Sequence, residues 1–515
     1  MRFILILSII FSSFFSGNML AQKSELSQFS IPGKNATELN EEAMRFFFLL
    51  NFDSASKNAR EAMMVARIKS GIDSPEEGRA LYILGKIELV QKKMPRAEYF
   101  FKKALPIQEK YFTQDPLSIA ETLDGLTTIY MDQKKLDLAA EVTQRATKIR
   151  EMALSAQEAR VNQAKTSGVK TVKITNTIKT AKNFENLAAI HYLKKEYDKA
   201  RPFYERALLL QKSALPPESL DLARAYENLA EVNLRLHSEK EAATLYEDAL
   251  RIRKLDLEKE PLPHIKSLDT LARLYIKEKA YTEAQACYEL SLTLKLKVYG
   301  DWHLELTSNL DNLTTIYRLR KQFSEAKPYA RRSLAIREKV LGRRHPDVAD
   351  SLDRLAIVYD HQGRYSKAEP LYSAALDIRT EAFGKDHLNT AVSLNNLARV
   401  WVQLKKYNDA EALYRKAISI WEKKLGPEDL TLAIPYSNLA ELLASQGRND
   451  EAEISYKKTI SLYEQKVASD DPRLLRAERN LESFYQKLEK SKRKEDFIEP
   501  ELFKKSIEMS TKNPL

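Results

Sequence analysis

One segment of the chain decides the fold: SLDRLAIVYDHQGRYSKAEPLYSAALDIR, from Ser351 to Arg379. Forty-two residues further on, the chain reads SLNNLARVWVQLKKYNDAEALYRKAISIW, from Ser393 to Trp421. In both segments, apolar, small and aromatic residues follow one another in steps of three, four and seven, which places them on one face of a helix. The segments therefore predict two helices joined by a turn, repeated with a period of 42 residues.

The small residue of this repeat is an alanine in every copy. An apolar residue, called the repeat leucine from here on, stands thirteen positions before it in the first helix. A tyrosine often follows the alanine by four positions, in the second helix. Small residues allow two helices to approach closely, and aromatic rings fill the space between layers. The alanines are Ala55, Ala97, Ala139, Ala200, Ala242, Ala284, Ala326, Ala368, Ala410 and Ala452, and the repeat leucines are Leu84, Leu126, Leu187, Leu229, Leu271, Leu313, Leu355, Leu397 and Leu439.

The composition agrees with long helices. Of the 515 residues, 43% are hydrophobic, but only 13 are glycine and 18 are proline. The single cysteine, Cys287, excludes an intrachain disulfide and a multi-cysteine metal site. The net charge of +11 is spread thinly, whereas nucleic-acid binding needs charge concentrated on one face. These numbers favour a large helical protein without a nucleic-acid partner.

These residues resemble the tetratricopeptide repeat, whose motif places small and aromatic residues at such offsets. The longer period and the phrases NNLA, KAEPLY and LGRRHPDVA resemble its kinesin-light-chain-type branch. The resemblance covers about residues 37–490. It implies an all-α fold, a right-handed solenoid of about ten 42-residue hairpins plus a C-terminal capping helix, with the first helices lining a concave groove.

The repeats divide the chain into seven parts. Between Ala139 and Ala200, 19 extra residues interrupt the period, and we expect them to form a disordered or hairpin-like excursion, with a docking element as the alternative. The parts are a signal peptide (1–21), a linker (22–36), repeats 1–3 (37–151), a basic insertion (152–183), repeats 4–10 (184–470), a capping helix (471–490) and a basic tail (491–515).

The N-terminus predicts export. Arg2 precedes an apolar run from Phe3 to Phe15, and the small residue Ala21 follows at a suitable distance for signal cleavage. The run is short for a membrane span, so an uncleaved anchor is the lesser alternative. Because the chain has almost no cysteine, we expect a bacterial protein of the periplasm or the secreted fraction, with peripheral membrane contact at most.

The sequence contains no catalytic or metal-binding constellation that we could identify. The sequence has no phosphate-binding glycine loop and no HExxH motif, and its spacing indicates no pair of a nucleophile and a base. His303, His345 and His387 recur every 42 residues, but equivalent positions of successive hairpins lie roughly 16–20 Å apart and cannot share one metal ion. We expect these histidines to be loop residues hydrogen-bonded to a helix end. The chain is therefore predicted to be no enzyme and to need no metal or cofactor.

One polar row on the first helices is a candidate binding site. It lies one position before the repeat leucine and is interrupted by Thr270 and Arg354. An amide offers both a donor and an acceptor, so it can pair with any peptide group of an extended partner. Proteins that this chain resembles use asparagines at this offset in that way, while hydrogen bonds between helices are the structural alternative. The row comprises Asn186, Asn228, Asn312, Asn396, Asn438 and Asn480.

A second, acidic row lies two positions before the repeat leucine. Acidic residues near a helix N-terminus are favoured by the helix dipole, which is one explanation. The other is a groove that prefers a cationic partner, and either explanation weighs against nucleic acid there. The row comprises Asp124, Glu185, Glu227, Asp269, Asp311 and Asp353, and it is replaced by Asn395, Ser437 and Arg479 in the last copies.

The leading functional hypothesis is an exported, non-enzymatic scaffold that binds an extended peptide or protein segment along these two rows. Each hairpin would contribute a small patch, so that affinity accumulates over several repeats. The alternative is a structural component of the cell envelope that associates with itself. A further alternative is attachment to an anionic membrane through the basic insertion and tail.

Overall fold

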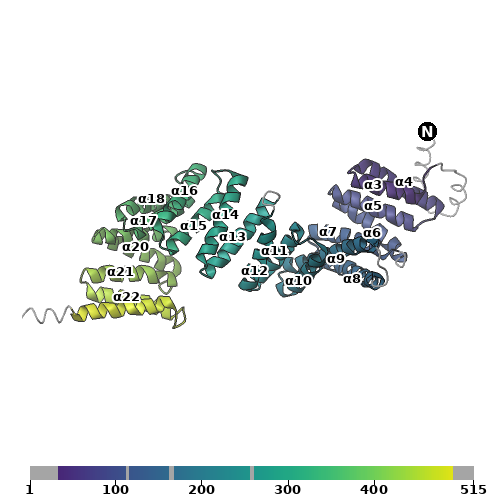
Figure 1. Ribbon diagram of the computed structural model, residues 1–515. Coiled ribbons are helices and arrows are strands. Elements are labelled where there is room, and N and C mark those ends of the chain that lie inside the picture. The colour runs from purple at the N-terminus through teal and green to yellow at the C-terminus, as the bar shows by residue number, and fades with distance from the viewer. Residues whose placement is uncertain (1–32, 112–114, 162–166, 256–259, 491–515) are drawn as a thin grey trace, which may run out of the picture. The chain divides into compact units, whose positions relative to one another are not determined.

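The computed structural model describes residues 33–111, 115–161, 167–255 and 260–490. All regular structure in these ranges is helical, and consecutive helices pair into ten hairpins, as Figure 1 shows. The predicted all-α fold with about ten repeats is therefore confirmed. The predicted signal peptide and basic tail lie outside the described residues.

The chain forms two compact units, which divide between Glu260 and Pro261. Each unit contains five hairpins. The helices of the first unit are α3 (Ala36–Phe48), α4 (Phe52–Lys69), α5 (Pro75–Val90), α6 (Met94–Lys110), α7 (Pro116–Asp132), α8 (Leu136–Val161), α9 (Ser167–Leu193), α10 (Tyr197–Ala214), α11 (Leu220–Arg235) and α12 (Glu239–Arg253). No described helix of the chain is long and apolar enough to span a membrane.

The second unit has the same plan with a short 3-10 turn before its last hairpin. Residues 472–490 add a final helix, in which Leu474, Ala477 and Phe484 are buried against the last hairpins. The other helices are α13 (Pro261–Lys277), α14 (Tyr281–Tyr299), α15 (Glu305–Leu319), α16 (Phe323–Leu341), α17 (Pro346–His361), α18 (Tyr365–Phe383), α19 (Leu388–Gln403), α20 (Tyr407–Leu425), η1 (Leu430–Leu432), α21 (Ala433–Ser445) and α22 (Asn449–Glu464).

The repeated alanines and tyrosines form the core of both units. All ten alanines are fully shielded from solvent, at 0% exposure. The tyrosines that follow them by four positions are buried as well, from Tyr204 in α10 to Tyr456 in α22. Close packing at small residues lets the two helices of each hairpin meet, and each ring then fills the space toward the next repeat.

Two kinds of turn connect the helices. After the second helix, Gly300, Gly342, Gly384 and Gly426 combine φ values of 78–92° with extended ψ, a conformation almost confined to glycine. Between the first and second helices, one residue has φ of 57–77° in every repeat. Six of these residues are lysines, although a left-handed conformation favours glycine. The ten are Leu50, Lys92, Lys134, Lys195, His237, Lys279, Lys321, Gly363, Lys405 and Gly447.

Replacing Lys279 by glycine is expected to stabilise the protein. Lys279 has φ of 61° and an exposed side chain, so glycine removes backbone strain at little loss of contact. We expect the free energy of unfolding in denaturant to rise by about 0.5–1 kcal/mol. The reverse change, Gly363→Lys at the equivalent turn, should lower it by a similar amount. Equal effects of the same sign would contradict this account of the turns.

The insertion between the third and fourth repeats lengthens two helices. α8 has 26 residues and α9 has 27, whereas the other helices have 13 to 19. Both ends of the insertion are thus helical, and its form as a disordered or hairpin-like excursion, with a docking element as the alternative, stays a prediction. Residues 162–166, at its tip, lie outside the described residues.

Candidate protein-binding site

The first helices present a shared surface in each unit. α3 contacts α5 and α5 contacts α7 in the first unit, while α15 contacts α17 and α19 contacts α21 in the second. We call the exposed side of these helices the first-helix surface. In α19 it includes Val392, Asn396 and Arg399, spaced by about one helical turn. In α21 it includes Ile434 and Asn438 at the equivalent positions.

All six predicted asparagines lie on this surface and are at least partly accessible. The structure divides them into two groups. Asn438 donates from Nδ2 to Asn395 Oδ1 at 3.1 Å, and Asn480 donates to Glu441 at 3.4 Å. These two side chains form hydrogen bonds between helices, which is the structural alternative to peptide binding.

The other four asparagine side chains form no hydrogen bond within the described part of the chain: Asn186, Asn228, Asn312 and Asn396. Asn228 is exposed, and the other three are half-buried. Their amides remain available to a bound peptide backbone. A binding role for the row stays a prediction, and these four are its best candidates.

The acidic row has partners inside each hairpin. The partner stands 26 residues later, on the second helix, and is a base in five of the six cases. In the second unit, Arg337 Nη2 donates to Asp311 Oδ2 at 2.8 Å and Arg379 Nη1 donates to Asp353 Oδ2 at 2.6 Å. The pairs are Asp124–Arg150, Glu185–Gln211, Glu227–Arg253, Asp269–Lys295, Asp311–Arg337 and Asp353–Arg379.

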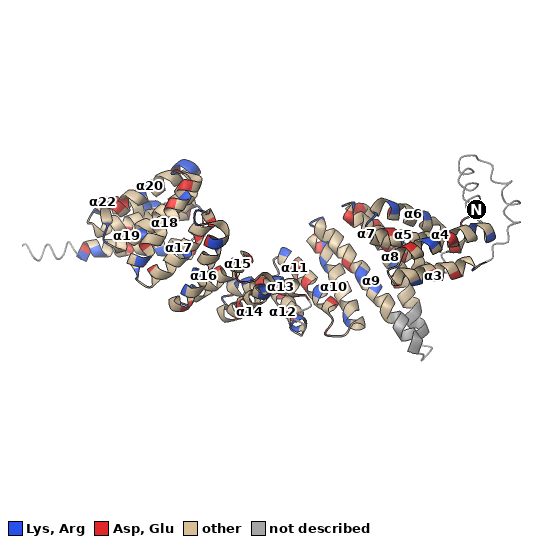
Figure 2. Cartoon of the chain, turned by 90° about the horizontal axis from the view of Figure 1, so that it is seen from above, with Lys and Arg blue, Asp and Glu red and all other residues tan. Residues whose placement is uncertain are grey.

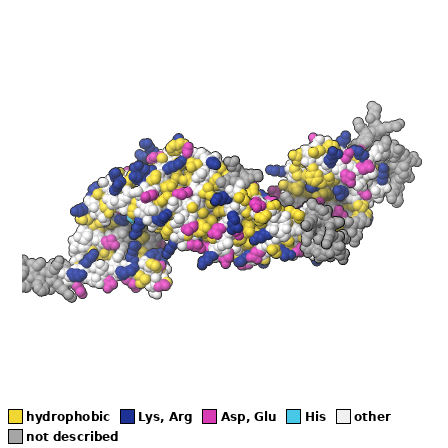
Figure 3. Space-filling model, in the orientation of Figure 1, with side chains coloured by type: hydrophobic (Ala, Val, Ile, Leu, Met, Phe, Trp, Pro, Cys, Tyr) yellow, Lys and Arg dark blue, Asp and Glu magenta, His cyan; other side chains and the backbone are white. Residues whose placement is uncertain are grey.

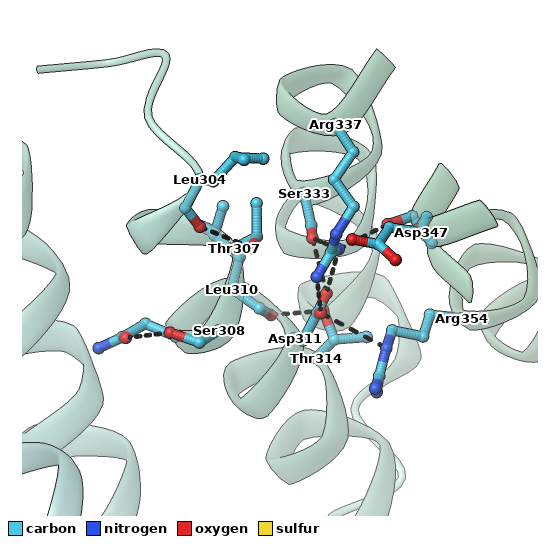
Figure 4. A network of polar contacts seen from close by, with 12 residues as sticks. Leu304, Thr307, Ser308, Leu310, Asp311, Thr314, Ser333, Arg337, Asp347 and Arg354 are labelled. Carbon is cyan, nitrogen blue, oxygen red and sulfur yellow. Dashed lines mark hydrogen bonds and ion pairs between the residues drawn. The ribbon is translucent and has the colours of Figure 1, made fainter. Parts of the chain in front are cut away.

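Three of the bases, Lys295, Arg337 and Arg379, also reach the first helix of the next repeat, so that one contact network joins three helices. Figure 4 shows the network at Asp311, where Ser333 donates to Oδ1 at 2.6 Å and Arg354 approaches Oδ2 at 3.5 Å. Arg337 Nη1 also donates to the hydroxyl of Ser351, on the following first helix, at 2.6 Å. We call this three-helix network the repeat clamp. Its equivalent in the next repeat joins Arg379 to Ser393.

The repeat clamps are buried, and burial affects their charges. The side chains of Arg150 and Arg253 are only 1% exposed. Burial raises the pKa of the Asp353 carboxyl, and the Arg379 guanidinium offsets this only in part. Burial likewise raises the pKa of Asp124 despite its bond to Arg150. The pairs therefore fix the helices in register more than they stabilise the fold, because desolvation cancels much of the attraction.

This geometry changes the explanation of the acidic row. Asp311 and Asp353 lie beyond the first turn of α15 and α17, so the helix dipole does not account for them. Their charge is compensated by the arginines, so a cationic ligand would have to displace an internal partner. The predicted binding role of Glu185, Glu227, Asp269, Asp311 and Asp353 stays a prediction, but the structure supplies each with a structural role.

The first-helix surface of the second unit carries exposed charges of both signs, with basic residues in slight excess. Its exposed acidic residues are Glu305, Asp347, Asp350 and Glu441, and Asp350 is bound by Arg379. Over both units, acidic and basic side chains alternate, and Figure 2 shows no face of one sign in its view. The basic residues of this surface in the second unit are Lys266, Arg273, Arg354, Arg399 and Arg476.

The basic partners of the acidic row were missed from the sequence, although a signal was present. The bases recur 26 residues after the acids, and they disappear together with them. Where the acid becomes Asn395, the partner position holds Trp421, and where it becomes Ser437, the position holds Tyr463. Comparing the two rows as pairs would have identified the clamps.

The three periodic histidines accept hydrogen bonds from the start of a helix, as predicted, and His345 and His387 are the N-cap residues of α17 and α19. The Nδ1 atoms of His303, His345 and His387 accept hydrogen bonds from backbone amides two residues later, at 3.1–3.2 Å. His303 and His387 also stack on aromatic rings one turn earlier. No group of three potential ligands suitable for a metal ion occurs among the described residues.

Comparison with known proteins agrees with the repeat geometry. The sequence profile of the tetratricopeptide repeat matches residues 40–111, 179–254, 265–339, 306–381, 347–423 and 402–465. The chain belongs to the tetratricopeptide-repeat family. A comparison with curated proteins found no match. Tetratricopeptide repeats form scaffolds that bind proteins and peptides, so the first-helix surface belongs to a fold used for that purpose.

Solved structures show similar tetratricopeptide repeats. A putative kinesin light chain of Podosopora anserina is 24% identical, over 41% of this chain and 97% of that one, with a TM-score of 0.36. The protein BtubC of P. vanneervenii is 22% identical over 47% and 92% of the two chains, with a TM-score of 0.34. The quorum sensor NprR of B. thuringiensis is 16% identical over 75% and 99%, with a TM-score of 0.39.

Proposed function

We propose that this protein is an exported, non-enzymatic scaffold that binds an extended protein segment along its first-helix surface. The observation that carries the proposal is the set of four asparagine side chains that form no hydrogen bond with the described part of the chain. Export rests on the apolar run from Phe3 to Phe15, which is typical of a signal peptide. The family supports protein binding, and the site residues rest on the geometry of the amides.

The surface offers two kinds of contact in the second unit. Asn312 and Asn396 can donate to and accept from a peptide backbone without selecting a side chain. Val392 and Ile434, at 41% and 60% exposure, offer apolar contacts about one turn away from the asparagines Asn396 and Asn438. An extended segment with apolar side chains at intervals fits this combination.

The charge of the surface indicates the character of the segment. Five of the six carboxylates of the acidic row are compensated by a base of the same hairpin, whereas Lys266, Arg273 and Arg354 are exposed. Complementary charge improves the rate and specificity of association. We therefore expect the bound segment to carry acidic rather than basic residues, which revises the cationic partner considered from the sequence.

Removing two amides should weaken binding without unfolding the protein. A peptide selected from a random library on the wild-type chain would be titrated by calorimetry against Asn312→Ala/Asn396→Ala. We expect the Kd to rise about 10- to 30-fold, because each amide contributes about 1 kcal/mol through its hydrogen bonds. The melting temperature should stay unchanged.

The matched control is Asn438→Ala, because this side chain already bonds to Asn395 inside the unit. It should alter the Kd less than either single change at Asn312 or Asn396. An unchanged Kd for the double variant would overturn the proposed site, and so would an equal loss in the control.

A further inference from the structure

We propose that the turns between first and second helices of the first unit form an edge that binds an anionic lipid surface. This edge is distinct from the first-helix surface, so the inference does not rest on the proposed function. The edge is made by the first four of the five turns, residues 49–51, 91–93, 133–135 and 194–196. Because α3, α5 and α7 stack side by side, their turns lie along the same side of the unit, as Figure 1 shows.

The turns carry lysines that the fold does not require. Lys92, Lys134 and Lys195 have φ of 57–63°, which costs free energy that glycine avoids at Gly363 and Gly447. Their side chains are exposed and form no ion pair within the described residues. The strained backbone therefore holds three positive charges in solvent, where they form no stabilising ion pair within the described residues. Contact with an anionic surface would provide such a stabilising interaction.

A second lysine accompanies each of them. Lys93 lies 3.9 Å from Glu88, and Lys194 bonds to Asp137, so these neighbours are held in place at the turns. Lys135 is exposed next to Lys134. The three turns thus present pairs of lysines at regular intervals. Basic residues near an anionic leaflet each contribute about fivefold to the partition coefficient.

The same edge bears exposed apolar side chains. Phe48, Leu49 and Leu50, at the turn after α3, are 70%, 66% and 74% exposed. Leu50 is itself in the left-handed position, with φ of 60°. Val90 and Leu193, just before the turns of α5 and α9, are 51% and 56% exposed.

Basic and apolar side chains lie next to each other at this edge. Lys86 of α5 lies over the rings of Phe47 and Phe48, at 4.8 and 5.8 Å, so that a positive charge sits beside the apolar tip. Hydrophobic side chains gather on the surface over α3 and α5 in Figure 3. Apolar side chains that enter the headgroup region, flanked by basic residues, are the combination by which peripheral proteins bind anionic bilayers.

The combination of charge and apolar surface at this edge indicates a lipid surface as the occupant. Stable attachment to a bilayer generally takes two weak signals, such as an apolar insertion and a basic patch, and this edge supplies both.

The test uses the chain from Gln22, which retains every described helix. Its binding to vesicles of equal parts phosphatidylcholine and phosphatidylglycerol would be measured by sedimentation, with phosphatidylcholine vesicles as the neutral comparison. We expect binding to the anionic vesicles alone, weakened by salt. The variant Lys92→Gly/Lys134→Gly/Lys195→Gly should lower the partition coefficient roughly 100-fold. Because each glycine relieves strain, circular dichroism and the melting temperature should show a folded protein.

The matched control makes the same three changes in the second unit: Lys279→Gly/Lys321→Gly/Lys405→Gly. The charge change is identical, but this edge bears a smaller exposed apolar surface, at Leu319 and Tyr407. We expect little loss of binding in the control, and a loss in the variant Leu49→Ser/Leu50→Gly of the first unit. Absence of vesicle binding, full binding by the first triple variant, or equal losses in both triple variants would overturn the proposal.

Discussion

Replacing Arg379 by methionine is expected to lower the free energy of unfolding of the second unit by about 3–5 kcal/mol, measured by chemical denaturation. Arg379 donates to Asp353 and Ser393 at 2.6 and 2.5 Å, and to Asp350 at 2.6 Å. Methionine fills a similar volume but leaves the carboxylate of Asp353 buried without a partner. The loss therefore comes from an uncompensated buried charge rather than from packing.

The chain itself supplies the control for this prediction. In the next repeat the acid and base are replaced by Asn395 and Trp421, both buried. The double variant Asp353→Asn/Arg379→Trp carries the two residues that the next repeat has at these positions. We expect it to recover most of the lost stability, because a buried ion pair contributes little over a neutral replacement. If the double variant is as unstable as Arg379→Met, the repeat clamp is not the source of the effect.

Replacing Phe101 by alanine is expected to lower the free energy of unfolding of the first unit by about 3–5 kcal/mol. The ring is 1% exposed and lies between two glycines, Gly85 of α5 and Gly125 of α7. An added Cβ would stand 2.7 Å from the ring at Gly85 and 2.5 Å at Gly125. Removal of the ring thus leaves a cavity that these glycines cannot fill. The neighbouring change Tyr99→Ala, at 58% exposure, should have a much smaller effect.

The converse substitution tests the same contact. Gly125→Ala should cost about 1–3 kcal/mol alone, because the methyl group overlaps the ring of Phe101. Combined with Phe101→Ala, the added methyl occupies part of the cavity, and the double variant should lose less than the two single losses together. Strictly additive losses would show that the ring and the glycine are independent.

This contact also explains why the third repeat has no asparagine at the position of the row. Gly125 stands one position before the repeat leucine, where most later repeats have asparagine. The ring of Phe101 takes the space that a side chain would need there. The row of amides accordingly begins at Asn186, in the fourth repeat.

The sequence predicts the fold well because the core is periodic. Each alanine from Ala55 to Ala452 is a position where only a small residue lets two helices meet, and a 42-residue period repeats that requirement ten times. The division of the chain between Glu260 and Pro261 was not predictable in this way, because Leu229 and Leu271 keep the same spacing across it.

The candidate site was predictable only in part. A sequence row shows which residue types share a face, but it does not show whether Asn438 bonds to Asn395 or leaves its amide free, since that depends on how neighbouring first helices pack. The charges were also predictable in part. The 26-residue spacing of acids and bases indicates the pairs within a hairpin, but the contacts of Arg337 and Arg379 with the next first helix depend on packing between repeats.

Photo-crosslinking tests the central claim, that the first-helix surface binds the partner, most directly. A benzophenone amino acid would replace Val392 on α19, beside Asn396, and in a second variant Ile454 on α22. Both side chains are exposed, at 41% and 68%, so access is comparable, but only Val392 belongs to the first-helix surface. The account predicts that a library-selected peptide crosslinks from position 392 and not from 454. Crosslinking from 454 alone, or equally from both positions, would contradict it.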